Sequence, residues 1–501
     1  MNVAEMKTQH AGDDLDSRLE VAPTLIIALH PELSRIGESA PLLGLVTEGR
    51  DYLSRNRPDF AHNGRAAMPL NEPRISRSPV IIQQDNEENY RIRAHSTSTT
   101  VNIAGRAEQS EYLLSGADLS SGVVISLNKT VVLVLKYMPL RDIRTAENSL
   151  LKGLSPDIKA ISSHLEHIAE LNLPVMIRGA AGTGKELTAL QLHRTIFAEE
   201  KPFVCVNLAA IHDAVAAEEL FGGYFGSQRN VGYFAQAEGG TLVLEDLEDA
   251  SEEVISLLFK VLTKGYYLCK DNQTPKTLNC RLILTSIYES CPYTEDSRLQ
   301  QLANHLSAYQ IFLPALSERV EDISLLFIQF VREQWRRLCP DKPLELAVPA
   351  ELISQLLTFN WPGNVRQLRN VARQVVIDSR DCRALQLDTQ LLSILKPRLN
   401  PTAPAGANRK PNTISREELL AALQNNRFEL QSTATELRIS RASVYQLIQR
   451  FDGIQTAQDI TEAQLRESFE KHQGDTEQMM WQLKVSQVGL RRRLKALGFD
   501  I

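Results

Sequence analysis

The apolar residues of the chain repeat with a different period from one segment to the next. In residues 20–140, short runs rich in Val, Ile and Leu are separated by clusters of Gly, Pro, Asn and Ser, which predicts strands. Residues 150–330 alternate apolar strands with helical patterns, which predicts a parallel sheet with flanking helices. Apolar positions in residues 331–398 keep a helical spacing. We therefore expect a multidomain protein with a β domain, an α/β domain and a helical lid.

The remainder of the chain is a linker and a helical tail. Residues 399–412 are rich in Pro, Ala and Asn and predict the linker. In the tail, a shift of 46 residues aligns residues 413–453 with residues 458–501 without a gap. The aligned apolar pairs include Ile414 with Ile460, Leu419 with Leu465, Leu437 with Leu483, Val444 with Leu490, and Ile448 with Leu494. Two copies of one three-helix unit are the simplest explanation.

Composition limits the classes of protein that need to be considered. A chain of 501 residues is too long for one hydrophobic core, so we expect three or more domains. Its 43% hydrophobic and 23% charged residues are ordinary for a globular protein. The net charge of -6 excludes a general polycation, so any nucleic-acid surface must be local.

The compartment is predicted from the cysteines and from the N-terminal segment. None of the six cysteines forms a C-x-x-C pair or has a histidine at zinc-finger spacing, which favours thiols in a reducing compartment. The first residues include Glu5, Asp13, Asp14 and Asp16 without an apolar stretch, which argues against a signal peptide. No apolar run approaches the length of a membrane span. We expect a cytoplasmic protein that does not contact membranes.

A phosphate-binding loop is the strongest local motif. Gly179-Ala-Ala-Gly-Thr-Gly-Lys185 matches G-x-x-x-x-G-K, and it lies between an apolar strand and a helical segment. The glycines allow backbone N–H groups to turn inward onto phosphate oxygens, while the lysine and the helix N-terminus add positive charge. The order of strand, loop and helix therefore predicts nucleotide binding.

The residue after this lysine is Glu186, where Ser or Thr is usual. The surrounding sequence resembles the AAA+ domain of bacterial enhancer-binding proteins, the activators of sigma-54 RNA polymerase, in which Glu is usual at this position. The resemblance covers roughly residues 150–395. It is carried by residues 179–186, 202–211, 219–222, 237–242, 313–323 and 361–368. It implies that ATP is held by Gly179, Gly182, Thr183, Gly184, Lys185, Glu186 and the lid residue Arg366.

The carboxylates expected at the end of the Walker B strand are exchanged. The family has Asp followed by Glu, whereas this chain has Glu245 followed by Asp246. The resemblance implies that Glu245 helps to hold Mg²⁺, that Asp246 orients the attacking water, and that Asn207 is the polar partner of the Walker B carboxylate. Because Asp246 is one methylene shorter than Glu, we expect the water to be poorly placed and hydrolysis to be slow.

Other departures from the family point in the same direction. The sigma-contacting motif Gly-Ala-Phe-Thr-Gly-Ala is absent, and the segment from Phe221 to Gly232 is about five residues shorter than in the family. The sensor strand ends in Ile287 instead of Asn. The two places for trans-acting arginines hold Leu299 and His305, with Arg298 beside them as a substitute. We predict ATP binding with weak or absent hydrolysis. The alternative is an active ATPase that activates sigma-54 RNA polymerase.

The N-terminal β domain resembles a forkhead-associated domain, a β-sandwich that binds phosphothreonine peptides. Its Gly-Arg element is matched by Gly49-Arg50, or less closely by Arg35-Ile-Gly37, and its Ile-Ser-Arg segment by residues 75–77. Thr99-Thr-Val-Asn102 resembles the segment whose Asn grips the peptide backbone. The family's His is replaced by Pro79. The resemblance implies a phosphate site formed by Arg50, Ser76, Arg77 and Asn102; the alternative is a β-sandwich that only docks on its neighbours.

The first unit of the tail resembles the Fis-type helix-turn-helix of enhancer-binding proteins. Residues early on its recognition helix are expected to face the major groove, and Ser440 is expected to cap that helix. The second unit has Met480 in place of Ala434, and its basic segment would neutralise phosphates. The predicted DNA-binding residues are Arg441, Ser443, Tyr445, Gln446, Arg491, Arg492 and Arg493, with Arg450 on phosphate.

Together these patterns predict a transcription regulator. Its expected partners are double-stranded DNA, RNA polymerase and a phosphothreonine protein. We expect a homo-oligomer, either a dimer or a hexamer. Two helix-turn-helix copies in one chain would span two half-sites alone, or the second would serve as a dimerisation unit. A phosphothreonine-dependent adaptor is the second alternative to the regulator.

Overall fold

A computed structural model describes most of the chain in two compact units, residues 1–400 and 401–501. In the first unit it describes residues 21–61, 66–86, 89–94, 97–140, 149–171, 173–197, 201–225, 228–269, 275–287, 302, 309–340, 347–380, 382 and 384–386. In the second it describes residues 415–426, 428, 433, 437, 447–448, 460, 462–472, 475–483, 485, 490 and 493–494. None of the helices formed by these residues has the length and apolar character needed to cross a bilayer.

The β domain consists of two antiparallel sheets that share one core. One sheet has the order β2 (Ser39–Pro41), β1 (Val21–Leu29), β9 (Val131–Pro139), β8 (Val123–Leu127) and β6 (Val101–Ile103). The other has the order β3 (Arg50–Leu53), β4 (Val80–Asn86), β5 (Asn89–Arg93) and β7 (Glu111–Ser115). Two short helices, α2 (Leu43–Thr47) and α3 (Gly116–Ser121), join strands. A residue whose side chain points between the sheets, such as Leu25 or Ile92, is fully buried.

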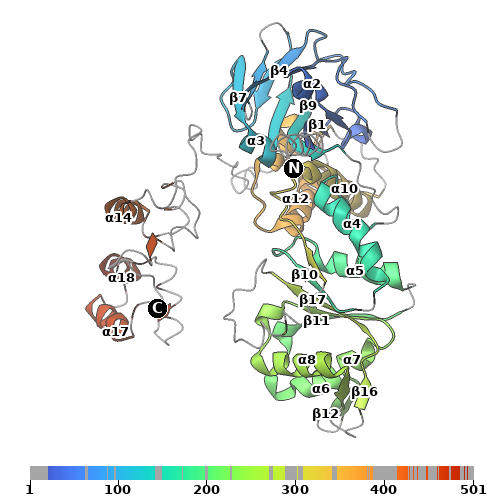
Figure 1. The fold of residues 1–501 in the computed structure, drawn as a ribbon, viewed down its shortest axis with the longest axis vertical. Helices are drawn as coiled ribbons and strands as arrows, with labels where there is room; N and C mark the ends of the chain where they lie inside the picture. The colour runs from blue at the N-terminus through green and yellow to red at the C-terminus, as the bar shows by residue number, and fades with distance from the viewer. Residues whose placement is uncertain are drawn as a thin grey trace, which may run out of the picture. The chain divides into compact units, whose positions relative to one another are not determined.

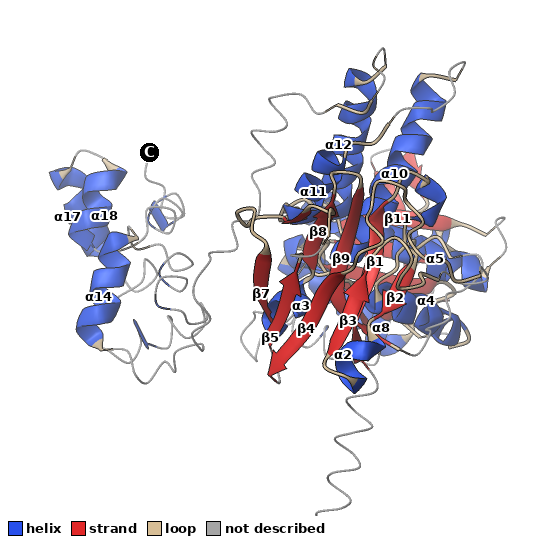
Figure 2. Ribbon diagram, turned by 90° about the horizontal axis from the view of Figure 1, so that it is seen from above, coloured by secondary structure: helices blue, strands red, loops and turns tan. Residues whose placement is uncertain are grey.

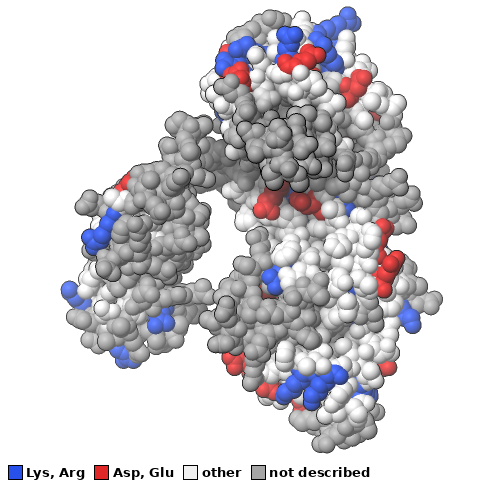
Figure 3. Space-filling view, viewed as in Figure 1, with Lys and Arg blue, Asp and Glu red and all other residues white. Residues whose placement is uncertain are grey.

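The exposed face of the four-stranded sheet is covered by ion pairs. Arg91 on β5 binds Asp85 and also binds Glu111 on β7, while Arg93 binds the same Glu111 at 3.1 Å. Figure 3 shows Lys and Arg interleaved with Asp and Glu at the end of the domain that carries β4 and β7. Opposite charges on neighbouring strands stabilise the pairing of those strands. Because the two signs alternate, this face does not form a surface of one charge.

The α/β subdomain contains a five-stranded parallel sheet with the strand order β11 (Phe203–Asn207), β14 (Thr241–Glu245), β17 (Arg281–Ser286), β10 (Val175–Arg178) and β18 (Gln310–Phe312). Its strands are almost continuously apolar, as expected for a parallel sheet buried on both faces. The helices are α4 (Pro156–Ala169), α5 (Lys185–Ile196), α6 (Ala216–Phe221), α7 (Tyr233–Gln236) and α8 (Glu252–Lys264). Two hairpins, β12 (Gly223–Phe225) with β13 (Gln228–Asn230) and β15 (Tyr266–Leu268) with β16 (Pro275–Thr277), complete it.

Three helices form the lid: α10 (Val320–Leu338), α11 (Ala350–Thr358) and α12 (Asn364–Asp378). The predicted boundary at residue 331 lies inside α10, so the lid begins about ten residues earlier than the sequence analysis placed it. The acidic pair Glu321 and Asp322 lies in the first turn of α10, where the helix dipole favours negative charge. The predicted boundary of the lid differs because the first half of this amphipathic helix was assigned to the preceding α/β segment.

The β domain packs directly on the lid. In β1, Leu25 and Ile27 face the sandwich core, whereas Ile26 and Ala28 face α10 and α11. Val132 and Val134 on β9 join the same cluster as Phe327 and Ile353 of the lid. Figure 1 shows the lid between the β strands and the α/β subdomain, and Figure 2 shows β1, β8 and β9 beside α10 and α11. The five-stranded sheet of the β domain, which contains β1 and β9, is therefore buried on both faces.

The second unit has one core to which both copies of the repeat contribute. Helix α14 (Arg416–Asn425) and helix α17 (Glu462–Lys471) have bounds that differ by 46 residues at both ends. Helix α18 (Thr476–Leu483) follows α17. Phe428 of the first copy contacts Trp481 of the second edge to face, with ring centroids 5.8 Å apart. The shared core contains Leu419, Leu423, Leu437, Ile448, Leu465, Met479, Met480, Leu490 and Leu494.

The junction between the β domain and the lid can be tested by exchanging neighbouring residues on β1. We predict that Ile26→Ala destabilises the first unit by about 2–5 kcal/mol, as much as Ile27→Ala, because both side chains are buried in tightly packed cores. Urea titration monitored by the buried lid residues Trp335 and Trp361 measures this change. Val21→Ala, at a side chain 44% exposed, is the control. An Ile26→Ala variant as stable as this control would show that the junction does not form.

Candidate functional site

The phosphate-binding loop follows β10 and ends at the first turn of α5. Gly179, Gly182 and Gly184 all have left-handed φ angles, of 153°, 77° and 114°. A Cβ on Gly182 would lie 2.4 Å from the Gly363 carbonyl oxygen, so only glycine fits there. Gly184 is the N-cap of α5, which leaves the N–H groups of the first helical turn directed at the loop.

The lid holds the outer side of this loop through three consecutive carbonyl groups. Asn364 Nδ2 donates to the Ala181 oxygen at 2.9 Å, and the Val365 N–H donates to the Gly182 oxygen at 2.9 Å. Arg319 Nη2 donates to the Thr183 oxygen at 3.1 Å. Because these carbonyls accept hydrogen bonds from the lid, the lid holds the backbone of the loop in place. Its fold therefore depends on the position of α10 and α12.

Lys185 is surrounded by carboxylates. Its Nζ donates to the Gly179 carbonyl oxygen at 2.8 Å. Burial lowers the pKa of Lys185, although Asp246, Glu248 and Glu245 oppose this shift through their negative charge. Arg366 of α12 lies close enough to repel the ammonium. Burial, assisted by the charges of Glu186 and Asp246, raises the pKa of Glu245. The site thus combines two cations with several acidic groups.

The exchanged pair at the end of β14 has a well-defined geometry. Asp246 Oδ2 accepts a hydrogen bond from Asn207 Nδ2 at 3.2 Å, and its N–H donates to Thr285 Oγ1 at 3.2 Å. Its backbone has φ +56°, a left-handed conformation that Asp adopts at a modest cost. The structure therefore brings Asn207, Glu245 and Asp246 together at the carboxyl end of adjacent parallel strands.

Glu248, which the sequence analysis did not select, also belongs to this site. Its Oε1 accepts a hydrogen bond from the N–H of Ile287 at 2.9 Å, and so ties the segment after β14 to the end of β17. Its buried Oε2 has no hydrogen-bond partner among the described residues. Ile287 therefore takes part in the site through its backbone, although it lacks the side-chain amide of an Asn. A carboxylate two residues after an acidic pair has no spacing signal that would have revealed this contact.

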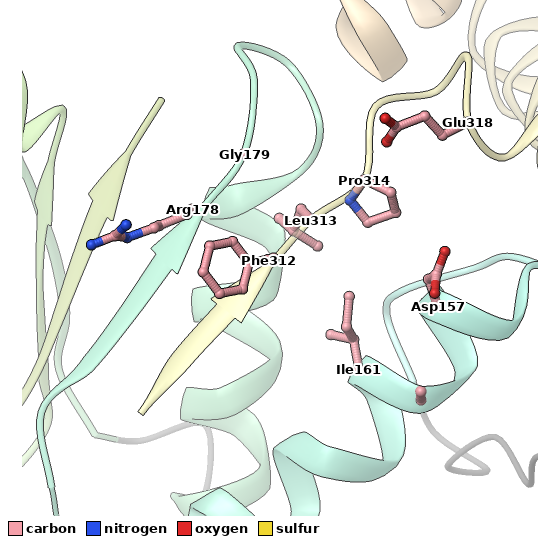
Figure 4. Close-up of a pocket in the computed structure, with 9 residues that line it drawn as sticks. Asp157, Ile161, Arg178, Gly179, Phe312, Leu313, Pro314 and Glu318 are labelled. Carbon is pink, nitrogen blue, oxygen red and sulfur yellow. The ribbon is translucent and has the colours of Figure 1, made fainter. Parts of the chain in front are cut away.

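A cavity of about 530 Å³ adjoins the start of the loop. Figure 4 shows it between α4, which supplies Asp157 and Ile161, and the segment from Phe312 to Pro314, with Gly179 at its edge. Glu318, just before α10, closes another side. The cavity has both apolar and charged walls, as ligand pockets generally do.

The segment expected to contact sigma factor is a short hairpin. β12 pairs with β13 in antiparallel register, with Gly223 opposite Asn230 and Phe225 opposite Gln228. The hairpin is closed at its base by Gly222 and Gly232, each with a positive φ and no room for a Cβ. Leu299, His305 and Arg298, the positions considered for trans-acting arginines, lie outside the described residues.

Comparison with protein families assigns this region. Residues 151–311 match the family model described as the sigma-54 interaction domain, and residues 317–394 match the AAA+ ATPase lid domain. Residues 151–394 are homologous to the sigma-54 interaction domain and its lid. We refer to these residues as the sigma-54 interaction module.

Curated relatives share this module. The chain is 35% identical over 231 residues to the DNA-binding transcriptional regulator NtrC of Bradyrhizobium, a match that covers 45% of this chain and 47% of that protein. It is 27% identical over 330 residues to the anaerobic nitric oxide reductase transcription regulator NorR of Vibrio vulnificus, which covers 61% and 64%. The chain thus spans about half of the NtrC relative and just under two thirds of the NorR relative. A crystal structure of NtrX from Brucella abortus in complex with ADP aligns over 60% of this chain and 69% of that chain, with 25% identity and a TM-score of 0.43.

Outside the module, the predicted phosphate site of the β domain is brought together only in part. The N–H of Ser76 donates to Thr99 Oγ1 at 2.9 Å, and Asn128 ties the carbonyl of Arg74 to the N–H of Thr100. The loops 72–78, 97–100 and 127–130 therefore meet at one end of the sandwich. Arg77 is exposed in the first of these loops, and the exposed Asn102 follows the second at the start of β6.

Neither arginine of the predicted Gly-Arg element reaches that end. β3 pairs with β4 so that Leu53 lies opposite Val80, on the side of Ser76, whereas Arg50 lies opposite Gln83 at the far end. The two ends of β3 are about 10 Å apart along the strand. Arg35 is buried and donates to Glu38 and to the carbonyl groups of residues 68–70. The inclusion of Arg50 in the site is therefore corrected.

Arg55 is the arginine that the fold places beside Ser76. Its N–H donates to the Ser76 carbonyl at 3.0 Å, and its guanidinium donates to the carbonyls of Glu72, Pro73 and Ile75. Its role is thus to shape the loop 72–78. The sequence analysis missed it because Ser54-Arg55 does not match the Gly-Arg dipeptide.

Most predicted DNA-contacting residues lie outside the described part of the chain. These are Arg441, Ser443, Tyr445, Gln446, Arg450, Arg491 and Arg492. Arg493 is described as half-buried in a short helical stretch. Leu490 and Leu494, which flank it, are buried in the shared core, so the basic segment is anchored by its apolar positions.

Proposed function

We propose that this chain is a DNA-binding transcription regulator whose sigma-54 interaction module binds MgATP and hydrolyses it slowly or not at all. The observation that carries this proposal is the phosphate-binding loop, held by the lid through three carbonyl groups and followed by Lys185. The N–H groups of Gly179 and Thr183 bond to the Ser286 and Ala180 oxygens, and the other N–H groups of the loop are the ones proposed to bind phosphate oxygens. NtrC and NorR, named as transcription regulators, support the regulatory role.

The residues around the loop fit a nucleotide with its metal ion. Gly179, Gly182, Thr183, Gly184 and Lys185 would hold the phosphates, with Glu186 in the first turn of α5 and Arg366 on the lid. Mg²⁺ is usually held by one or two carboxylates together with phosphate oxygens, so Glu245 at the end of β14 is sufficient as a protein ligand. Among the described residues, no three acidic, histidine or cysteine side chains converge as a separate metal site. Bound Mg²⁺ would neutralise charge on the phosphates.

Slow hydrolysis follows from the acidic pair. Asn207 donates to Asp246, which supports Asp246 as the water-orienting carboxylate, and its side chain is one methylene shorter than that of Glu. A displacement of about 1 Å at such a position costs up to about 10²-fold in rate. Glu248 holds the N–H of Ile287 instead of leaving that strand end to sense a phosphate. These features favour a module that responds to nucleotide binding.

The hairpin formed by β12 and β13 argues against ordinary remodelling of sigma-54 polymerase. The Gly-Ala-Phe-Thr-Gly-Ala motif is missing, and the two strands are three residues each. We therefore propose that the protein contacts DNA and affects transcription without the usual sigma contact. The alternative is an ATPase that activates sigma-54 RNA polymerase, and the family match of residues 151–311 favours it. A measurement of the rate of ATP turnover distinguishes it from our proposal.

The tail is proposed to bind double-stranded DNA as a tandem pair. Both copies contribute to one core, and the equivalent helices α14 and α17 are related by the 46-residue shift. Two helix-turn-helix copies fixed in one unit would present two recognition helices without a second chain. Assembly of the module into a dimer or hexamer would add further sites.

A phosphothreonine partner is proposed for the β domain. The loops 72–78, 97–100 and 127–130 meet at one end of the sandwich, where Arg77 is exposed and Ser76 is held by Thr99. An arginine and a serine hydroxyl can both donate to a phosphate group. We propose Ser76, Arg77 and Asn102 as the phosphate and peptide contacts.

Nucleotide binding is tested with the fluorescent analogue mant-ATP and Mg²⁺. Lys185→Ala removes one charge-assisted contact, so we predict that its Kd rises roughly 10–100-fold. Lys264→Ala, an exposed lysine on α8, is the control and should leave the Kd unchanged. Turnover is measured in the same samples by phosphate release. Restoring the usual order with Glu245→Asp and Asp246→Glu together should raise it by up to about 10²-fold. Rapid turnover by the unmodified chain would favour the sigma-54 activator instead.

DNA binding is tested with the full chain on fragments selected from genomic DNA. Changing Arg491, Arg492 and Arg493 together to Gln should lower the slope of log Kd against log salt by about 2–3, because each phosphate contact contributes about 0.9. Arg441→Ala should weaken binding to the selected fragment by about 1–3 kcal/mol and have little effect on binding to scrambled DNA. Lys471→Gln, at an exposed lysine of α17, serves as the control. Salt-independent binding without sequence preference would sink this part of the proposal.

Phosphopeptide binding is tested with a phosphothreonine peptide library and its unphosphorylated counterpart. We predict that Arg77→Ala abolishes selective retention, because it removes the exposed guanidinium at the loop cluster. Arg50→Ala, at the other end of β3, should retain it. The reverse result, with loss only in Arg50→Ala, would contradict the site at loops 72–78 and 97–100.

A further inference from the structure

The start of α10 connects three parts of the first unit through three closely spaced buried charges. Arg319, the residue before the helix, donates to the Thr183 oxygen of the phosphate-binding loop. Asp322 is fully buried and accepts from the N–H and hydroxyl groups of Ser155, both at 2.8 Å, and so holds the segment that begins α4. Glu321, between them, has a side chain 1% exposed and turns to the β domain. One helical turn thus touches the loop, α4 and the sandwich.

Lys136 of β9 is the partner of Glu321 across the junction. Its Nζ lies 2.8 Å from Glu321 Oε2 and donates to the Glu318 carbonyl at 2.7 Å, and its side chain is 11% exposed. Lys129 forms a second ion pair across the same junction, with Glu351 at 3.8 Å, but the side chains of both residues are largely exposed. An exposed pair of this kind contributes little. The buried pair is therefore the charged contact that can influence α10.

The charged groups at this turn are buried and have few partners. Burial raises the pKa of both Glu321 and Asp322, and the positive charges of Lys136 and Arg319 oppose the shift. Glu321 Oε1 and Arg319 Nε have no hydrogen-bond partner among the described residues. Arg319 forms an ion pair with Asp322, with Nη1 3.7 Å from Oδ2, and it also experiences the charge of Glu321. Without Lys136, the carboxylate of Glu321 would be uncompensated, and Arg319 is the cation available to it.

We propose that Lys136 is a positioning residue for the phosphate-binding loop. By engaging Glu321, Lys136 leaves Arg319 on the Thr183 carbonyl, so that docking of the β domain sets the affinity of the loop for nucleotide. A neutral apolar pair in this interface would serve stability equally well or better, because desolvation offsets most of the attraction of a buried ion pair. The apolar contacts of β1 and β9 already hold the domains together. This proposal rests on the proposed binding of ATP.

The test measures mant-ATP affinity in the full chain at 25 °C together with the thermal unfolding of each variant. Lys136→Met should raise the Kd about tenfold, and Lys136→Arg should stay close to the unmodified chain. Adding Glu321→Gln to Lys136→Met removes the uncompensated carboxylate and should recover most of the affinity. Lys129→Met is the matched control and should change nothing. A purely structural role would lower the unfolding temperature of Lys136→Met without changing the Kd of the folded protein.

A second measurement on the unmodified chain does not depend on the folding of a variant. Acetylation of Lys136 by an amine-reactive ester is followed by mass spectrometry, with and without saturating mant-ATP. Because coupling between two sites is reciprocal, nucleotide should slow the labelling of Lys136 and leave Lys129 unchanged. The proposal is overturned if folded Lys136→Met binds within about twofold of the unmodified chain, or if it does not fold and nucleotide leaves Lys136 labelling unchanged. Failure of the unmodified chain to bind mant-ATP would instead refute the proposed function.

Discussion

Two adjacent carboxylates, Glu321 and Asp322, are buried at the start of α10, and the arrangement of the first unit depends on satisfying them. Buried charges that lose their partners are strongly destabilising, so each carboxylate fixes the element that supplies its partner. Asp322 fixes the segment before α4 through Ser155, and Glu321 fixes β9 through Lys136. Arg319, at the N-cap of the same helix, fixes the phosphate-binding loop through Thr183. Apolar packing buries the interface between the β domain and the lid, and these contacts add specific polar pairings. Both neighbouring domains therefore contact the lid at the start of α10.

The same constraint explains how the phosphate-binding loop is prepared for a ligand. A glycine-rich loop on its own samples many conformations, because glycine has a wide choice of backbone angles. Here the carbonyls of Ala181, Gly182 and Thr183 are all bonded to lid groups, so the loop is fixed before any phosphate arrives. Such preorganisation favours binding. The acidic side of the site is organised differently, with Asp246 held by Asn207 and Glu248 held by the Ile287 N–H. Preorganised binding, together with an acidic side chain at Asp246 that is one methylene shorter than Glu, supports the proposal that the module responds to nucleotide binding.

The sequence predicted what depends on local pattern and missed what depends on distant pairing. The loop from Gly179 to Lys185 and the strands around it were predictable, because glycine spacing and apolar runs directly encode them. The repeat in the tail was visible because buried positions recur 46 residues apart. The run Val131-Val-Leu-Val-Leu135 predicted a strand, and its lack of alternation carried the further signal that both faces are buried. By contrast, the choice of Arg50 failed because strand register decides which end of β3 approaches Ser76, and register is set by pairing with β4. Lys136 was not identified either, because its partner lies 185 residues away.

Strand β9 and the turn before it contact both the loop cluster of the β domain and the start of α10. Asn128, in the turn before the strand, binds the backbone of Arg74 in the loop cluster, and Lys136 lies on the strand about 17 Å beyond its first residue, Val131. Strand β9 is hydrogen-bonded to a neighbour on each side, β1 and β8, and is therefore more constrained than an edge strand. A ligand that shifts the loop cluster would therefore change the seating of Lys136 on Glu321, and a ligand that shifts the lid would change the loop cluster by the same coupling free energy. If Lys136 positions the phosphate-binding loop as proposed, the β domain and the loop influence each other through one strand and one helical turn.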